Sequence, residues 1–181
     1  MKKLLVCFCF AAFLISCNSD KEKTDATSTS ADSTTKNTVA VDLPYTASYS
    51  SSWSTDVSDA DLKMVLTTYK DWADNNIAGL AKVMGDTVNL DMSTGNHKKM
   101  TNADLSKMWA TYRDSLSSVK INMDAWHKMY STDKKDSYIV TWYTETDTYK
   151  TGKVDSASYH DINQVKDGKI IWYSQYKRPK K

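Results

Sequence analysis

The chain has 181 residues, the size of one domain with short accessory segments. Its 24 Lys and Arg residues nearly balance its 22 Asp and Glu residues. A chain without a strong positive field has no general means of attracting nucleic acid, so we expect no nucleic-acid partner.

The first segment has the pattern of a targeting sequence. A basic start at Lys2 and Lys3 precedes an apolar run over residues 4–15, which is shorter than the roughly 20 residues that span a bilayer. The letters LISC at residues 14–17 resemble the lipobox of bacterial lipoproteins, in which the chain is cut before a cysteine that then receives lipid. The resemblance implies a signal peptide over residues 1–16 and acyl chains on Cys17 that bind a lipid bilayer. The alternative is an ordinary secretory peptide that happens to contain Cys17.

The lipoprotein interpretation has consequences for the mature chain. The implied location is the cell envelope, with the lipid anchor in the outer membrane and the side of that membrane left open. Cys7 and Cys9 leave with the peptide, so no free thiol remains for disulfides, cysteine-based zinc sites or thiol nucleophiles. Loss of Lys2 and Lys3 from the 24 basic residues leaves 22, equal to the 22 acidic ones.

Composition divides the rest of the chain. Residues 17–42 hold the lipidated cysteine and a Ser, Thr, Asp and Lys-rich stretch that predicts a disordered tether with a reach of about 25–30 Å. Residues 43–57 carry Tyr45, Tyr49 and Trp53, which predicts an extended arm lying on the domain. The domain itself is expected over residues 58–177, and residues 178–181 form a basic tail.

Three helices are predicted in the first half of this domain. Capping boxes, Ser-x-x-Asp at Ser58 and Thr-x-x-Asp at Thr101, open two of them, and Asn76 opens a short helix between, with Gly85 as its stop. Apolar residues recur at helical spacing in each segment. The inward positions are Leu62, Val65, Leu66, Tyr69, Trp72 and Ala73; Ile77, Leu80, Ala81 and Met84; and Leu105, Met108, Trp109, Tyr112 and Leu116.

The remaining segments alternate as strands do. Residues 86–92 predict a strand that turns at residues 93–96 into a short partner. A strand follows with Val119, Ile121, Met123, Ala125, His127 and Met129 on one side, and another covers residues 137–147. Asp167-Gly168 joins two final strands over residues 156–176, because this dipeptide is a strong hairpin signal.

This order of elements resembles the NTF2-like or SnoaL-like superfamily, which includes ketosteroid isomerase. The most specific matching pieces are WADNNIAGL at residues 72–80, GDTV at residues 85–88 and KDGKI at residues 166–170. The resemblance implies an α+β cone made of three N-terminal helices with a strand hairpin, then a curved antiparallel four-stranded meander. The mouth of such a cone often holds a small apolar ligand, and many members dimerise through the sheet. With the lipobox, the whole chain is similar to a SnoaL-like lipoprotein of Gram-negative bacteria.

The resemblance also implies site residues. In the isomerase branch, an Asp on the first long strand is the base, and a helix Tyr with a late protonated Asp forms the oxyanion hole. By position, Asp91 corresponds to the base, Asp161 to the late Asp and Tyr69 to the helix Tyr. Each residue also has a structural interpretation: Asp91 as an exposed strand residue, Asp161 bonded to a neighbouring Tyr or backbone, and Tyr69 and Trp72 as plain core.

Alternation gives an independent argument for Asp161. Tyr159, Asp161, Asn163 and Val165 share one face of their strand, and Val165 is the residue there least suited to solvent. The opposite face buries only Ile162 as an aliphatic, so the two choices differ by about 1.5–3 kcal/mol. Asp161 is therefore predicted to face the cone, with a pKa above that of a model aspartate.

Other residues give weaker signals. His127 on the apolar side of its strand is a pocket candidate or a satisfied core histidine, and His160 points away from its neighbour Asp161. We expect no metal and no cofactor, because the three histidines lack ligand spacing and no nucleophile elbow, phosphate loop or dinucleotide fingerprint is present. Four aromatic residues alternate with polar ones on neighbouring strands, which suits a homodimer or a glycan-like partner, or else packing against the arm. These are Trp126, Tyr138, Trp142 and Tyr143.

Three functions follow from these observations. The first is a membrane-anchored protein that binds a small apolar molecule in the cone without catalysis. The second is an isomerase, cyclase or hydratase that uses Asp91, Asp161 and Tyr69. The third is an interaction module that acts through its sheet face or as a homodimer.

Overall fold

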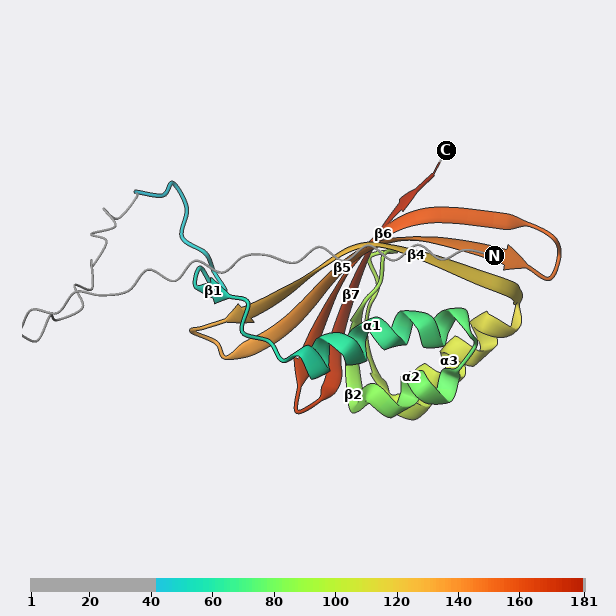
Figure 1. Ribbon diagram of the computed structural model, residues 1–181, viewed down its shortest axis with the longest axis horizontal. Coiled ribbons are helices and arrows are strands. Elements are labelled where there is room, and N and C mark those ends of the chain that lie inside the picture. Colours follow the sequence, from blue (N-terminus) through green and yellow to red (C-terminus); the bar gives the residue numbers. More distant parts are fainter. Residues whose placement is uncertain (1–41, 181) are drawn as a thin grey trace, which may run out of the picture. The chain divides into compact units, whose positions relative to one another are not determined.

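The computed structural model describes residues 42–180, and the residues from Leu43 onward form one compact unit (Figure 1). Its fold is α+β, with three helices and a seven-stranded mixed sheet. In chain order the elements are β1 (Trp53–Ser54), α1 (Asp59–Ala73), α2 (Ile77–Val83), β2 (Met84–Asp91), β3 (His97–Thr101), α3 (Asn102–Asp114), β4 (Leu116–Ser131), β5 (Asp136–Tyr149), β6 (Val154–Lys166) and β7 (Lys169–Pro179).

The helices begin where their caps predict. The Ser58 hydroxyl accepts from the backbone N–H of Asp61 at 3.0 Å, and the Thr101 hydroxyl accepts from that of Asp104 at 3.2 Å. Asn76 caps α2 through the backbone N–H of Gly79. Two expected helix ends are wrong. Met84 is already extended and Gly85 lies inside β2, and α3 ends at Asp114, so Leu116 belongs to β4.

The sheet has the order β1-β4-β5-β6-β7-β2-β3. The four long strands β4 to β7 form the predicted antiparallel meander, and Asp167 and Gly168, both at positive φ, make the predicted turn between β6 and β7. The sheet is wider than predicted, because β2 adds to β7 in parallel and the arm adds β1 to β4 through Trp53 and Ser131. Parallel pairing of β2 with β7 joins a strand from the first half of the domain to its last strand.

The sheet curves over the helices, which lie on its inner side (Figure 1). The core sits between them and draws on α1, α3 and every long strand except β4, which contributes partly buried residues. Its buried members are Val57, Val65, Tyr69, Met84, Val88, Leu90, Leu105, Ile139, Tyr143, Val165 and Ile170.

A β-bulge in β4 changes which residues face the core. The register with β5 shifts between Met123 and Ala125. A bulge inserts one extra residue, so the alternation of side chains is reversed beyond it. His127 consequently lies exposed on the outer face, and Tyr130 packs on the core. The expectation that His127 faces the interior is therefore wrong.

Several predictions fall on residues that the structure does not describe. The signal peptide, Cys17 and most of the tether lie outside residues 42–180. At the other end, β7 continues to Pro179, so Arg178 is a strand residue and not part of a tail. Within the described residues no helix combines the length and the apolar character that a membrane crossing requires.

Candidate functional site

A cavity of about 420 Å³ lies between the inner face of the sheet and the helices. One part of its wall is apolar and comes from α2, α3, β2 and the residue that follows β2. These residues are Leu80, Met84, Leu90, Met92, Met108 and Trp109. The opposite part carries hydroxyl, amide and charged groups from the long strands, so the cavity has an apolar wall and a polar floor.

The floor is organised around Asp161, which is 0 % exposed. Three tyrosine hydroxyls donate to its Oδ2: Tyr143 at 2.8 Å, Tyr69 at 3.0 Å and Tyr173 at 3.1 Å. All three tyrosines line the cavity, and they come from β5, α1 and β7 respectively. The carboxylate therefore lies directly beneath a layer of phenols contributed by three other elements.

Further polar groups complete this layer. The Tyr69 hydroxyl is hydrogen-bonded to Thr141 Oγ1 at 2.6 Å and accepts a hydrogen bond from Asn163 Nδ2 at 3.4 Å. Gln175 Nε2 donates to the Tyr173 hydroxyl at 2.6 Å. Such a chain of hydrogen bonds holds each ring in one orientation.

Burial sets the protonation of the floor. Removal from water raises the pKa of Asp161 to about 7, although the hydrogen bonds from the tyrosines oppose that rise. Burial also raises the pKa of Tyr69, and the nearby charge of Asp161 acts in the same direction. The phenol therefore stays a donor at neutral pH, while Asp161 is close to the midpoint of its titration.

An acidic pair beside the same cavity was not predicted from the sequence. Glu145 lines the cavity, and Asp147, two residues on along β5, is 5 % exposed. Burial raises the pKa of Glu145, and the like charge of Asp147 raises it further. The Tyr112 hydroxyl donates to Asp147 Oδ2 at 3.1 Å. The available signal was alternation, since Tyr143, Glu145 and Asp147 occupy every second position of one strand.

Four of the predicted residues meet at this cavity. Tyr69, Trp72 and Asn163 line it, and Asp161 lies beneath. The face of β6 that carries Asp161 is buried, as its alternation predicts. Trp72 stacks on Tyr112 with ring centres 6.0 Å apart.

Asp91 lies elsewhere. Its neighbour Leu90 faces the cavity, so Asp91 faces the other side of β2, where it pairs with His97 and accepts from Trp172 Nε1 at 2.7 Å. A hydrogen bond from His97 lowers the pKa of Asp91. The predicted grouping of Asp91 with Asp161 and Tyr69 is thus not present.

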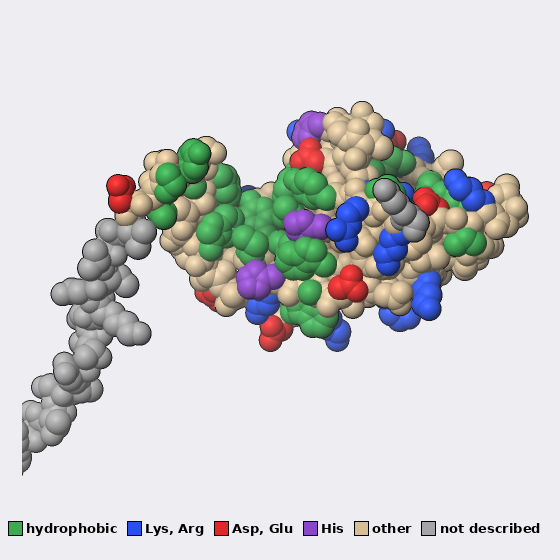
Figure 2. All heavy atoms as spheres, turned by 90° about the horizontal axis from the view of Figure 1, so that it is seen from above, with side chains coloured by type: hydrophobic (Ala, Val, Ile, Leu, Met, Phe, Trp, Pro, Cys, Tyr) green, Lys and Arg blue, Asp and Glu red, His purple; other side chains and the backbone are tan. Residues whose placement is uncertain are grey.

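The outer face of the sheet is aromatic, but not as predicted. Tyr143 points inward at 2 % exposure, whereas Trp142 points outward and stacks on His160 with ring centres 4.9 Å apart. His160 in turn stacks on Tyr176 at 5.6 Å. Figure 2, seen from above, shows hydrophobic and histidine side chains gathered on this face. Beyond the β4 bulge Trp126 pairs with Thr141, on the side of Asp161. The four predicted aromatics therefore do not share one face.

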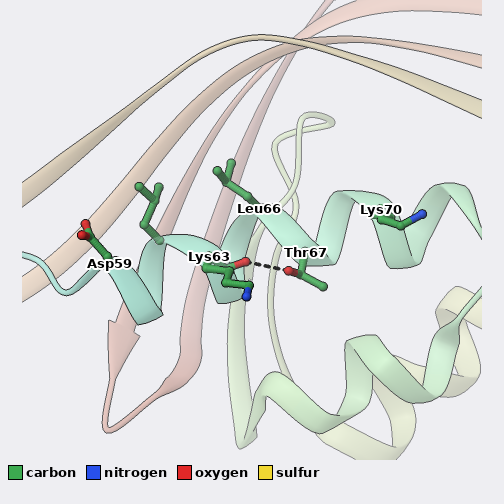
Figure 3. Close-up of a pocket in the computed structure, with 6 residues that line it drawn as sticks. Asp59, Lys63, Leu66, Thr67 and Lys70 are labelled. Carbon is green, nitrogen blue, oxygen red and sulfur yellow. Dashed lines mark hydrogen bonds between the residues drawn. The ribbon is translucent and has the colours of Figure 1, made fainter.

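A second depression, of about 330 Å³, runs along α1 (Figure 3). It is lined by Asp59, Leu62, Lys63, Leu66, Thr67 and Lys70. Asp59 is engaged by Lys128 at 3.0 Å, and Thr67 Oγ1 donates to the Lys63 carbonyl at 2.7 Å, the bond drawn dashed in Figure 3. This surface groove brings no buried polar groups together, so the cavity is the better site. Among residues 42–180 no cluster of three or more His, Cys, Asp or Glu residues is placed to hold a metal.

Solved structures share this architecture at low sequence identity. An LEH-like epoxide hydrolase from M. tuberculosis aligns with a TM-score of 0.56 and 8% identity, covering 66% of this chain and 83% of its own. AusH from Aspergillus nidulans aligns with a TM-score of 0.55 and 13% identity, covering 67% of this chain and 86% of its own. An NTF2-like protein from Anabaena variabilis aligns with a TM-score of 0.53 and 14% identity, covering 68% of this chain and 92% of its own. The described residues have the NTF2-like fold. No protein-family model and no curated protein matches the sequence.

Proposed function

We propose that the protein binds a small, mostly apolar molecule in the cavity above Asp161. The observation that carries the proposal is the division of the cavity into an apolar wall and a floor of tyrosine hydroxyls. Ligand sites in proteins combine a large apolar lining with a few fixed polar groups in this way.

The two parts have different tasks in this proposal. Met84, Met92 and Met108 are flexible, polarisable side chains that adapt to irregular apolar shapes. The hydroxyl oxygens of Tyr69 and Tyr173, whose protons are directed to Asp161, can accept a hydrogen bond from an N–H or O–H group of a ligand. Burial of the apolar part supplies affinity, and the floor sets orientation.

The test is binding of N-phenyl-1-naphthylamine, an uncharged dye whose fluorescence rises in apolar surroundings. The purified protein should bind it saturably, and Met108→Trp, which fills the cavity, should weaken binding at least about tenfold. Asp91→Asn, a change on the same domain but outside the cavity, should leave binding unaltered. Equal binding by the Met108→Trp protein would contradict the proposal.

A second candidate is acid–base catalysis at the same floor, of the isomerase, cyclase or hydratase type. A carboxyl with a pKa of about 7 beside hydroxyl donors suits proton transfer at neutral pH, and one of the similar structures is an epoxide hydrolase. Asp161 and Tyr69 remain its candidates, without Asp91. Turnover of an epoxide or ketone that survives Asp161→Asn unchanged would remove this candidate.

We also propose the lipid anchor on Cys17 that the LISC motif supports. Two or more acyl chains hold a protein stably on a bilayer, so the protein should fractionate with membranes after a salt wash. Cys17→Ser should release it to the soluble fraction, and membrane retention of that variant would contradict the anchor.

A further inference from the structure

The cavity holds more acidic than basic groups. Glu145 lines it, and Asp161 and Asp147 are buried within and beside it. Lys177 is the only basic residue among the described residues of its lining. If all three acids ionise, the site carries a net negative charge inside a largely apolar enclosure.

None of these three acids has an ion pair among residues 42–180. Lys177 pairs with a different carboxylate, that of Asp155 at 3.3 Å, and its attraction to Asp147 does not overcome the effect of burial, which keeps the pKa of Asp147 raised. The buried Arg113 is engaged by the carbonyls of Trp72 and Ala73, both at 3.0 Å.

Two buried carboxylate oxygens are not hydrogen-bonded within residues 42–180. Oδ1 of Asp147 and Oδ1 of Asp161 have no hydrogen-bond partner within the described part of the chain, although both side chains are at least nine-tenths buried. A buried carboxylate oxygen without a partner is unfavourable, and a positive charge in the neighbouring cavity reduces that cost through space.

The aromatic lining favours the same kind of ligand. The Lys177 ammonium lies over the Tyr159 ring, 5.6 Å from its centre. The negative ring face attracts cations, so this contact shows that the site already accommodates an ammonium group. Tyr112 and Trp109 line the same cavity.

We propose that the ligand carries a positively charged nitrogen, such as an amine or a quaternary ammonium, seated beside Glu145. Its apolar part extends along Leu80, Leu90 and Met108. This inference rests on the proposed ligand-binding function and adds the chemical class of the ligand. It also gives the acidic pair a role, because the cation stabilises the ionised form of Glu145 that burial and Asp147 disfavour.

The test compares two probes of equal shape. Benzyltrimethylammonium has a charged quaternary nitrogen where neopentylbenzene has a neutral quaternary carbon. Each probe is used to displace N-phenyl-1-naphthylamine from the purified protein. The charged probe should displace the dye at a concentration about tenfold or more below that of the neutral one. Glu145→Gln should abolish most of this preference, and Lys177→Met should increase it, while Asp91→Asn leaves it unchanged.

A second measurement covers the case in which Glu145→Gln does not fold. In the wild-type protein, affinity for benzyltrimethylammonium should rise with pH as the buried carboxyls ionise, whereas that for neopentylbenzene stays flat. A flat profile for the charged probe, or preference for the neutral one, overturns the inference and leaves the apolar binding function standing. Failure of the dye itself to bind overturns both.

Discussion

The two faces of β5 and β6 differ in where their polar groups lie. Inside, Tyr143 and Asp161 belong to a buried network of hydroxyls and a carboxylate. Outside, the adjacent residues Trp142 and His160 form an aromatic stack in which Trp142 is exposed and His160 is half-buried. A sheet with one solvated face normally buries its apolar residues and exposes its polar ones. The inversion at these positions marks the inner face as a site as well as a core.

The largest expected difference concerns the neighbours Tyr143 and Trp142. Tyr143→Ala should lower the free energy of unfolding by about 3–5 kcal/mol, because removal of a buried ring that packs on Tyr69 and Tyr159 leaves a cavity. Trp142→Ala should lower it by about 0.5–1.5 kcal/mol, since it loses mainly an exposed stack. Urea unfolding of both variants measures this, and equal losses would show that the two faces are energetically alike.

The second difference is a pH dependence set by Asp161. Its pKa is about 7 in the folded protein, against about 3.9 for an unfolded aspartate, so the folded state binds more protons between these values. Stability should therefore fall as the pH rises from about 4 to about 7, and Asp161 should contribute about 4 kcal/mol to that fall.

Asp161→Asn removes this titration and should make the profile of unfolding free energy against pH shallower, with the remaining slope due to Glu145 and Asp147. A carboxyl NMR titration of the wild-type protein measures the same group directly. An Asp161 that titrates near 3.9 would contradict both the burial argument and the pH dependence.

The smallest effect is expected at Asp91, the aspartate on the other face. The hydrogen bond from His97 lowers its pKa, so Asp91 contributes stability above the ordinary aspartate pKa and loses it as the pH falls through the lowered value. The pair is largely exposed and screened by solvent, so Asp91→Asn should alter the unfolding free energy at pH 7 by less than about 1 kcal/mol. A loss comparable to that of Tyr143→Ala would mean that the outer pair is structurally essential.

Local patterns anticipated much of the fold because their causes are local. The caps at Ser58 and Thr101 and the Asp167-Gly168 turn each depend on a few consecutive residues. The inward orientation of Asp161 follows from strict alternation along β6. The same rule, applied to Val88, Leu90 and Met92, puts Asp91 on the opposite face of its strand. The superfamily resemblance instead groups Asp91 with the residues of the cone, without regard to this alternation.

Tertiary structure decided what no single segment contains. The β4 bulge that turns His127 outward depends on pairing with β5, and the parallel pairing of β2 with β7 joins segments far apart in the chain. The three tyrosines reach Asp161 from α1, β5 and β7, so their meeting requires the packing of the helix and the register of both strands at once. The sequence by itself determined which face of β6 is buried, because alternation is a local property of an extended chain. The tertiary structure alone determined what that face meets, because hydrogen bonds between distant elements depend on how those elements pack.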